Sequence, residues 1–82
     1  MTFFWRANRR ADITVRLEYR QEHLGNYVQA REISYDEVKG SVKTKFEITG
    51  DDYLQDGRIV AWRAILIEQG KIVGLTQSYL WN

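Results

Sequence analysis

The sequence contains no cysteine and a single histidine, His23, among its 82 residues. Without cysteine, neither disulfides nor thiolate metal sites are available, and one histidine cannot assemble a zinc or haem site, which draws on several such ligands. Packing therefore has to supply the stability of the chain, and we expect neither a metal nor another cofactor. Because a chain without cysteine is tolerated in any redox compartment, a cytoplasmic protein and a mature exported domain both fit the sequence.

The sequence also lacks a charge excess and a long apolar run. Twelve Lys and Arg against eleven Asp and Glu leave a formal net charge of +1, which produces no long-range field able to gather nucleic acid or anionic membrane. No stretch approaches the ~20 apolar residues of a membrane-spanning helix, so we expect no membrane span. Since 82 residues lie near the lower limit for one hydrophobic core, residues 1–82 are predicted to form a single domain.

Catalytic motifs are equally scarce. The sequence has no G-x-S-x-G elbow and no glycine loop of the phosphate-binding kind, and His23 has no nucleophile near it in the sequence, so an exposed turn histidine is the interpretation we favour. Asp51, Asp52 and Asp56 could offer oxygens to Ca²⁺, but their spacing departs from the EF-hand order, and aspartate is a normal turn residue. We predict that the protein is not an enzyme, and we assign no catalytic or metal-binding residue.

What the sequence does contain is the pattern of an all-β domain. Six glycines divide the chain into segments of strand length, and aromatic and β-branched residues are abundant. The segment "DITVRLEYR" alternates strictly, which predicts a strand with one packed face made of Ile13, Val15, Leu17 and Tyr19. A helix ending at Gly25 is the competing interpretation of "RLEYRQEHLG".

Further strands are predicted along the rest of the chain. Residues 27–33 alternate weakly, and "SVKTKFEITG" alternates with lysines outward. Between them, "SYDEVKG" predicts a single helical turn, because Ser34 and Glu37 can form a capping box that Gly40 closes. Residues 58–67 and 72–81 form a hairpin around "EQGK", where Gly70 can take the positive φ that such a turn needs.

The first strand of that hairpin is apolar on both faces except at Arg63. We therefore expect it to be central in the sheet and covered on both sides. Five or six antiparallel strands with frequent turns predict a small antiparallel β-sandwich, with a partly open small β-barrel as the alternative. The stretch "DDYLQDGRIVAWRAILIEQGKIV" also resembles, in layout, the last strands of an immunoglobulin-like or fibronectin-like sandwich, over about a quarter of the chain. The resemblance implies an immunoglobulin-like fold.

The function predicted from these features is that of a non-enzymatic protein-interaction or assembly module, whose partner is another protein or a second copy. Aromatic residues, isoleucine and arginine are enriched at interface hot spots, and they occur at the chain ends and in the 58–67 strand. On this hypothesis a partner covers the apolar face and meets the Arg63 guanidinium. In the competing interpretation, Arg63 lies along the sheet with its charge in water. The candidate binding residues are Arg63, Trp5, Trp81, Phe4 and Ile65.

Two other functions remain open. The chain could be a small barrel that binds single-stranded nucleic acid through Arg6, Arg9, Arg10, Arg16 and Arg20, with aromatic rings as stacking platforms. The balanced charge counts against this alternative, because such proteins concentrate positive charge on one face. The chain could also be one structural domain of a larger surface or phage assembly that donates its N-terminal strand to a neighbour.

Overall fold

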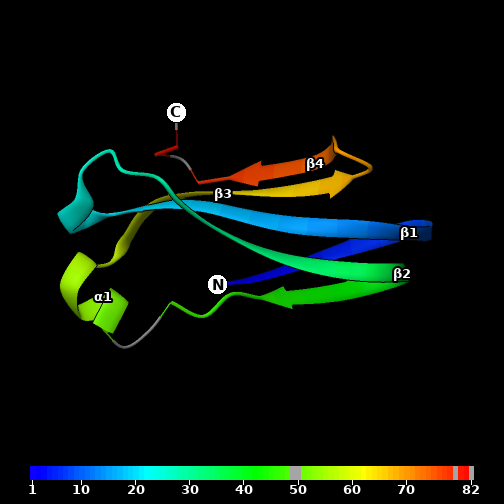
Figure 1. The fold of residues 1–82 in the computed structure, drawn as a ribbon, viewed down its shortest axis with the longest axis horizontal. Coiled ribbons are helices and arrows are strands. Elements are labelled where there is room, and N and C mark those ends of the chain that lie inside the picture. Colours follow the sequence, from blue (N-terminus) through cyan, green and yellow to red (C-terminus); the bar gives the residue numbers. More distant parts are fainter. Residues whose placement is uncertain (49–50, 79, 82) are drawn as a thin grey trace.

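The computed structural model describes residues 1–48, 51–78 and 80–81, without the side chains of residues 51–53. The described chain is all-β and forms one open, four-stranded antiparallel sheet in the order β2-β1-β3-β4 (Figure 1). The elements are β1 (Thr2–Gln21), the 3₁₀ turn η1 (Glu22–Leu24), β2 (Gln29–Lys45), α1 (Asp51–Asp56), β3 (Ile59–Glu68) and β4 (Lys71–Gln77). Because β2 and β4 are edges, the sheet does not close into a barrel.

The strands β1 and β2 are long and folded double. They contain 20 and 17 residues, and both turn back at the same end of the molecule (Figure 1). At the bend the β1–β2 register slips twice between Ala7 and Ile13, and Glu37 and Gly40 of β2 take φ angles of +48° and +90°. Such bulges bend a strand and increase its twist. The sheet therefore has two layers: a short layer of residues 2–7 and 40–45, and a long layer of residues 13–21 and 29–35 with β3 and β4.

A single contact demonstrates how sharply β1 turns back. Phe3 and Tyr19 belong to the same strand, which would hold them about 50 Å apart if it were straight. The ring of Phe3 nevertheless lies 5.2 Å, centroid to centroid, from that of Trp62, and Trp62 is the register partner of Tyr19 on β3. The two layers thus face each other across one core.

That core uses the alternation visible in the sequence. Residues of one face of β1 are buried together with two that follow β2, and they are Ile13, Val15, Leu17, Tyr19, Phe46 and Ile48. Phe3 and Trp5 of the short layer pack against them, and the Trp5 indole N–H donates to the Thr44 hydroxyl at 2.9 Å. The prediction of a strand at "DITVRLEYR" is confirmed, and the helical interpretation is wrong.

The β3–β4 hairpin is confirmed as well. Glu68 pairs with Lys71, and the two residues between them, Gln69 and Gly70, have φ angles of +51° and +75°. Positive φ at both positions is the signature of the type I′ turn, whose twist matches that of the strands it joins. As expected from its apolar faces, β3 is a central strand, between β1 and β4.

The finer architecture differs from the expectation. A separate second sheet of a sandwich or immunoglobulin-like kind is not seen among the described residues, because β1 and β2 pass through their bends from one layer into the other. This is also why four strands occur where five or six were predicted.

The helical turn predicted at "SYDEVKG" is wrong, since the segment lies inside β2. The Ser34 hydroxyl is not a helix cap but lies 3.1 Å from the Thr14 hydroxyl across the sheet. The Glu37 amide donates instead to the Asp12 carboxylate, at 2.8 Å. A residue of β1 thus takes the amide that the capping box would have used.

Candidate functional site

The five candidate binding residues lie in three separate places. Because β1 folds back, the outward faces of its two halves point to opposite sides of the molecule (Figure 1). Trp5 points into the core, whereas Phe4 points outward from the short layer and is 78 % exposed. Arg63, Ile65 and Trp81 are together on the outer face of the long layer. The residues therefore do not form one surface.

On that outer face, Arg63 has partners within its own chain. It faces Glu18 in the β1–β3 register and donates to that carboxylate through Nε, at 2.9 Å, and through Nη2. Its guanidinium carbon lies 5.1 Å from the centroid of the Trp81 ring, and that of Arg20 lies 5.5 Å from the same ring. The interface hypothesis expected a partner protein to provide a carboxylate or an aromatic ring for Arg63. The chain itself provides both, in Glu18 and Trp81.

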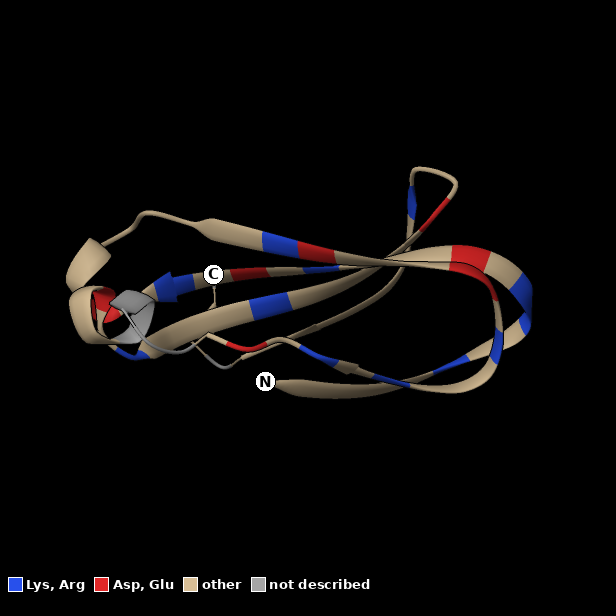
Figure 2. Cartoon of the chain, turned by 60° about the horizontal axis from the view of Figure 1, so that its bottom comes forward, with Lys and Arg blue, Asp and Glu red and all other residues tan. Residues whose placement is uncertain are grey.

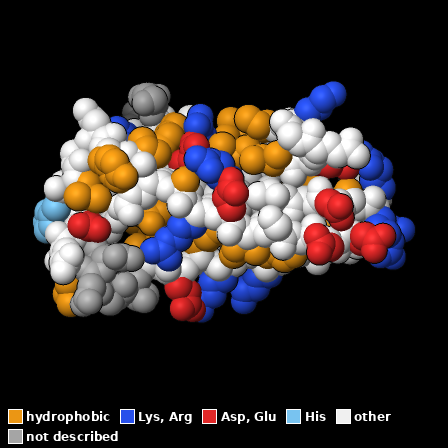
Figure 3. Space-filling view, viewed as in Figure 1, with side chains coloured by type: hydrophobic (Ala, Val, Ile, Leu, Met, Phe, Trp, Pro, Cys, Tyr) orange, Lys and Arg blue, Asp and Glu red, His pale blue; other side chains and the backbone are white. Residues whose placement is uncertain are grey.

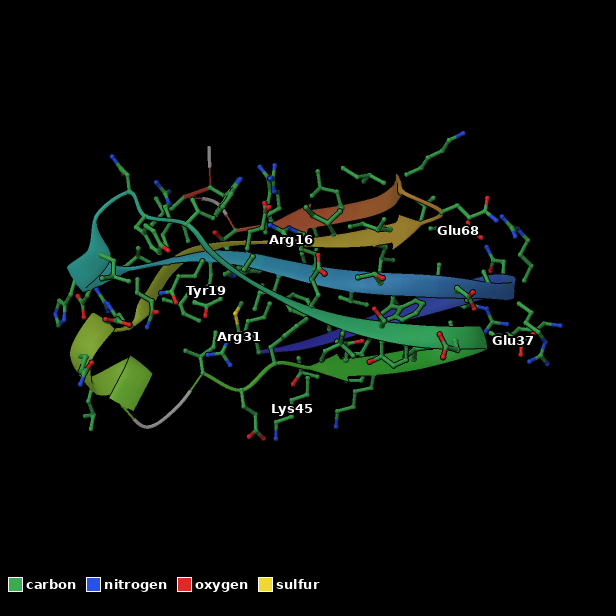
Figure 4. All side chains as sticks on the ribbon, in the orientation of Figure 1. Arg16, Tyr19, Arg31, Glu37, Lys45 and Glu68 are labelled. Atoms are coloured by element: carbon green, nitrogen blue, oxygen red, sulfur yellow. The ribbon has the colours of Figure 1, made fainter. Side chains whose placement is uncertain are left out.

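Glu18 belongs to a row of alternating charges that crosses three strands. From β2 to β3 the row consists of Glu32, Arg16, Glu18 and Arg63. The Arg16 guanidinium contacts both carboxylates: its Nη1 lies 2.9 Å from Glu32 Oε2, and its Nε lies 3.0 Å from Glu18 Oε2. Arg16 is labelled in Figure 4, beside β3, with which this part of β1 pairs. The hydrogen bonds to Glu18 and then Glu32 raise the pKa of Arg16 against the effect of burial. Partial burial acts to raise the pKa of Glu18, but hydrogen bonds from Arg63 and Arg16 outweigh it and lower this pKa.

The outer face of β3 is partly covered by the segment that follows β4. The Ser78 amide donates to the Trp62 carbonyl at 2.9 Å, and the Trp81 amide donates to the Ser78 carbonyl at 3.1 Å. This turn brings the Trp81 ring to the arginines beside β3, where Ala61 is fully buried and Ile65 is 4 % exposed. The prediction that both faces of β3 are shielded is confirmed for these positions.

A different group of apolar side chains is exposed. Ile72, Val73 and Leu75 of β4 are each more than half exposed, and orange side chains interrupt the polar surface along the upper rim of Figure 3, where Figure 1 places β3 and β4. The sequence pattern predicted mixed polar and apolar faces for β4 but did not identify it as a binding site. One feature of the sequence could have identified it: Lys71 is the only charged residue in this strand.

An apolar cavity of about 200 Å³ lies between the short layer and β4. Phe4 lines it from the short layer and Leu75 from β4, above a floor that includes Val15 and Leu66. Both rim residues are well exposed. We call the exposed apolar side chains of this strand the β4 surface and define it as Ile72, Val73 and Leu75; the cavity lies beside it.

The backbone of β4 is also open along one side. In the described chain β4 pairs with β3 alone. The Ser78 amide donates to the Trp62 carbonyl of β3. In an antiparallel ladder, backbone groups point alternately toward and away from the partner strand. The N–H and C=O of Thr76 therefore point toward β3, and those of Leu75 and Gln77 point away from it. Within the described part of the chain, the β4 surface thus presents backbone groups without a strand partner as well as apolar side chains.

The five arginines of the nucleic-acid alternative are dispersed. Arg16 and Arg20 lie on the outer face of the long layer, whereas Arg6 points outward from the short layer, on the opposite side. Arg9 is 2.9 Å from Glu68, and Arg10 donates to the Glu37 carbonyl at the bend. Figure 2 shows acidic and basic segments side by side along the strands, without a basic face of the sheet in that view.

His23 lies exposed in η1, where its Nδ1 is 3.0 Å from the Gln55 carbonyl oxygen and its Nε2 is 3.8 Å from the Glu22 carboxylate. Among the residues that the structure describes, no group of three or more His, Cys, Asp or Glu could hold a metal ion. The side chains of Asp51 and Asp52, considered above for Ca²⁺, lie outside the described residues. In the same part of the chain, no helix is both long and apolar enough to cross a membrane.

In comparisons with protein-family models, with curated proteins and with solved structures, nothing matches the chain.

Proposed function

We propose that the chain is a non-enzymatic protein-interaction or assembly module, which binds another protein or a second copy through the β4 surface. The observation that carries this proposal is the combination, on one edge strand, of exposed Ile72, Val73 and Leu75 with a backbone that pairs with β3 alone among the described residues. Exposed apolar patches on soluble proteins typically mark interaction sites. An edge strand of this kind pairs with another chain unless something protects it.

The edges formed by β2 and β4 differ in a way that supports the proposal. The β2 edge carries the bend and the exposed charges Lys39, Lys43 and Lys45, and lysines and bulges are common means of keeping an edge from pairing. In β4 the only charge, Lys71, stands at the first position. The β2 edge is therefore protected, and the β4 edge is open.

The residues that the sequence suggested for binding take different roles in this proposal. Phe4 lies next to the proposed site rather than in it, because it lines the cavity that Leu75 also lines but points outward from the other layer. Trp5, packed in the core, and Arg63 and Trp81, engaged with each other, act in this proposal as supports of the scaffold. Two layers that face each other across one core favour describing that scaffold as a sandwich-like one, in which the bent strands replace the second sheet.

The proposal is tested by cross-linking and affinity purification of the tagged chain from its native cells. The wild type is compared with Leu75→Lys, which places a charge in the β4 surface, and with Leu54→Lys, which makes the same change at the 77 % exposed Leu54 of α1. We expect a stoichiometric protein, a second copy included, that Leu75→Lys loses and Leu54→Lys retains. Recovery of the chain alone, monomeric with every variant, would contradict the proposal.

A further inference from the structure

We infer that the open edge of β4 pairs antiparallel with β4 of a second copy, so that two four-stranded sheets join into one continuous sheet around a two-fold axis. This inference rests on the proposed function and specifies its partner and its mode of binding. The hydrogen-bonding groups of the edge require an extended strand as occupant, since only a strand supplies donors and acceptors at matching intervals.

The backbone of β4 is suited to this pairing beyond its turn. The β3–β4 register slips between Leu66 and Ile67, close to the hairpin turn, whereas residues 74–77 pair regularly with β3. Leu75 and Gln77 turn their N–H and C=O outward in that regular part. A two-fold axis at Leu75 places Leu75 opposite its own copy, so that two leucine side chains meet at the centre of the contact.

Charge favours a copy of the same strand as the occupant. Lys71 is the only charged residue of β4 and stands at one end, so antiparallel pairing holds the two lysines at opposite ends of the joint. Parallel pairing would set them side by side, where like charges destabilise a cross-strand pair. The formal net charge of +1 adds little repulsion between two copies, and a net charge near zero favours self-association.

The first experiment measures molar mass by sedimentation and light scattering over a range of concentrations. We expect the wild type to move from monomer to dimer as concentration rises, and Leu75→Lys to stay monomeric at concentrations about tenfold or more above the wild-type midpoint. Leu54→Lys, the matched control, should dimerise as the wild type does. A wild-type monomer at millimolar concentration would overturn the inference.

The second experiment identifies the surface that associates. Hydrogen exchange followed by NMR should give slow exchange at Thr76 in monomer and dimer alike, because that amide faces β3. The amides of Leu75 and Gln77 should exchange rapidly in the monomer and slow down as the dimer forms. A dimer in which these two amides remain unprotected associates through a side-chain face, which overturns edge pairing.

These outcomes separate the inference from the proposed function. A chain that stays monomeric by itself but binds another protein, with loss of binding in Leu75→Lys, overturns self-pairing and leaves the interaction module in place. A dimer with slowed Leu75 and Gln77 amides supports both.

Discussion

Arg63 and Trp81 meet on the outer face of the long layer, with the guanidinium carbon 5.1 Å from the centroid of the indole ring. Arg20 lies over the same ring at 5.5 Å. We expect Trp81→Ala to lower the free energy of unfolding by about 1–3 kcal/mol, from two lost cation–π contacts and from the lost packing of a half-buried ring. Urea denaturation measures the loss. Leu80→Ala, at a 61 % exposed neighbour, should change stability by less than about 0.5 kcal/mol; equal effects of the two variants would argue against this role for Trp81.

The same geometry changes the expectation for Arg63. Removing its guanidinium leaves the Glu18 carboxylate, 14 % exposed, without one of its two arginine donors. Arg63→Ala should therefore lower the free energy of unfolding by about 1–3 kcal/mol and leave self-association unchanged when stability and molar mass are measured side by side. Arg58→Ala, at a 72 % exposed side chain, is the control. If Arg63→Ala weakened self-association without lowering the free energy of unfolding, Arg63 would be a binding residue rather than a support of the fold.

The lowered pKa of Glu18 predicts how the stability of the fold changes with pH. This pKa is lowered in the folded protein from its ordinary value of 4.5, because Arg63 and Arg16 donate hydrogen bonds to the carboxylate, so the folded state favours the ionised carboxylate. Its contribution to stability is complete above that ordinary value and is lost as the pH falls through the lowered pKa. Glu18→Gln should thus be less stable than the wild type at neutral pH, and the gap should close between pH ~5 and pH ~2. A gap that widens toward low pH would contradict this sign. Glu47→Gln, at a 66 % exposed carboxylate, serves as the control.

The contact between Phe3 and Trp62 joins the two layers. Trp62→Ala should lower the free energy of unfolding by about 3 kcal/mol. In a double-mutant cycle with Phe3→Leu and Trp62→Leu, the aromatic pair should show a coupling energy of about 0.5–1.5 kcal/mol. Phe4, which is exposed on the other face of the same strand, provides the matched position: Phe4→Leu should show no coupling to Trp62→Leu. Absence of coupling in the Phe3 cycle would mean that the layers do not depend on this contact.

The β3–β4 turn holds a residue that is poorly suited to its conformation. Gln69 has a φ of +51°, and asparagine adopts this region more readily than glutamine. Gln69→Asn should raise the free energy of unfolding by about 0.5 kcal/mol, whereas Gly70→Ala, at a φ of +75°, should lower it by about 1 kcal/mol or more. Thermal and urea unfolding check both. Equal stability of all three proteins would mean that the turn does not limit the hairpin.

The parts of the fold that the sequence predicts are those set by alternation and turn chemistry. The packed face of residues 13–19 and the hairpin at Gly70 follow from local rules that the structure leaves intact. In β2 the alternation changes phase: Ile33 and Tyr35 point inward, and after the bulge Val38, Val42 and Thr44 do so. This one-residue shift in the alternation, together with Gly40 at the bend, produces a sequence pattern that resembles a short capped helix.

The candidate site was harder to predict because it depends on the bend. Alternation tells which side chains of β1 share a face, but the fold-back sends Phe4 to one side of the molecule and Arg16 to the other, and no local pattern contains that information. For Arg63 the sequence left two interpretations open, because its partners Glu18 and Trp81 lie 45 positions before it and in the segment that follows β4. The open edge of β4 likewise cannot be identified until the order of the strands in the sheet is known.

The doubled β1–β2 hairpin also determines how the chain reaches this state. Thr2 pairs with Lys45, and Met1 exchanges hydrogen bonds with Phe46, so the first strand is complete only after a loop of more than forty residues has closed. Closing such loops costs entropy before any contact repays it, and topologies rich in distant pairings typically fold in milliseconds to seconds. During synthesis on the ribosome, the side chains of Phe3 and Trp5 therefore emerge well before the core residues that they pack against.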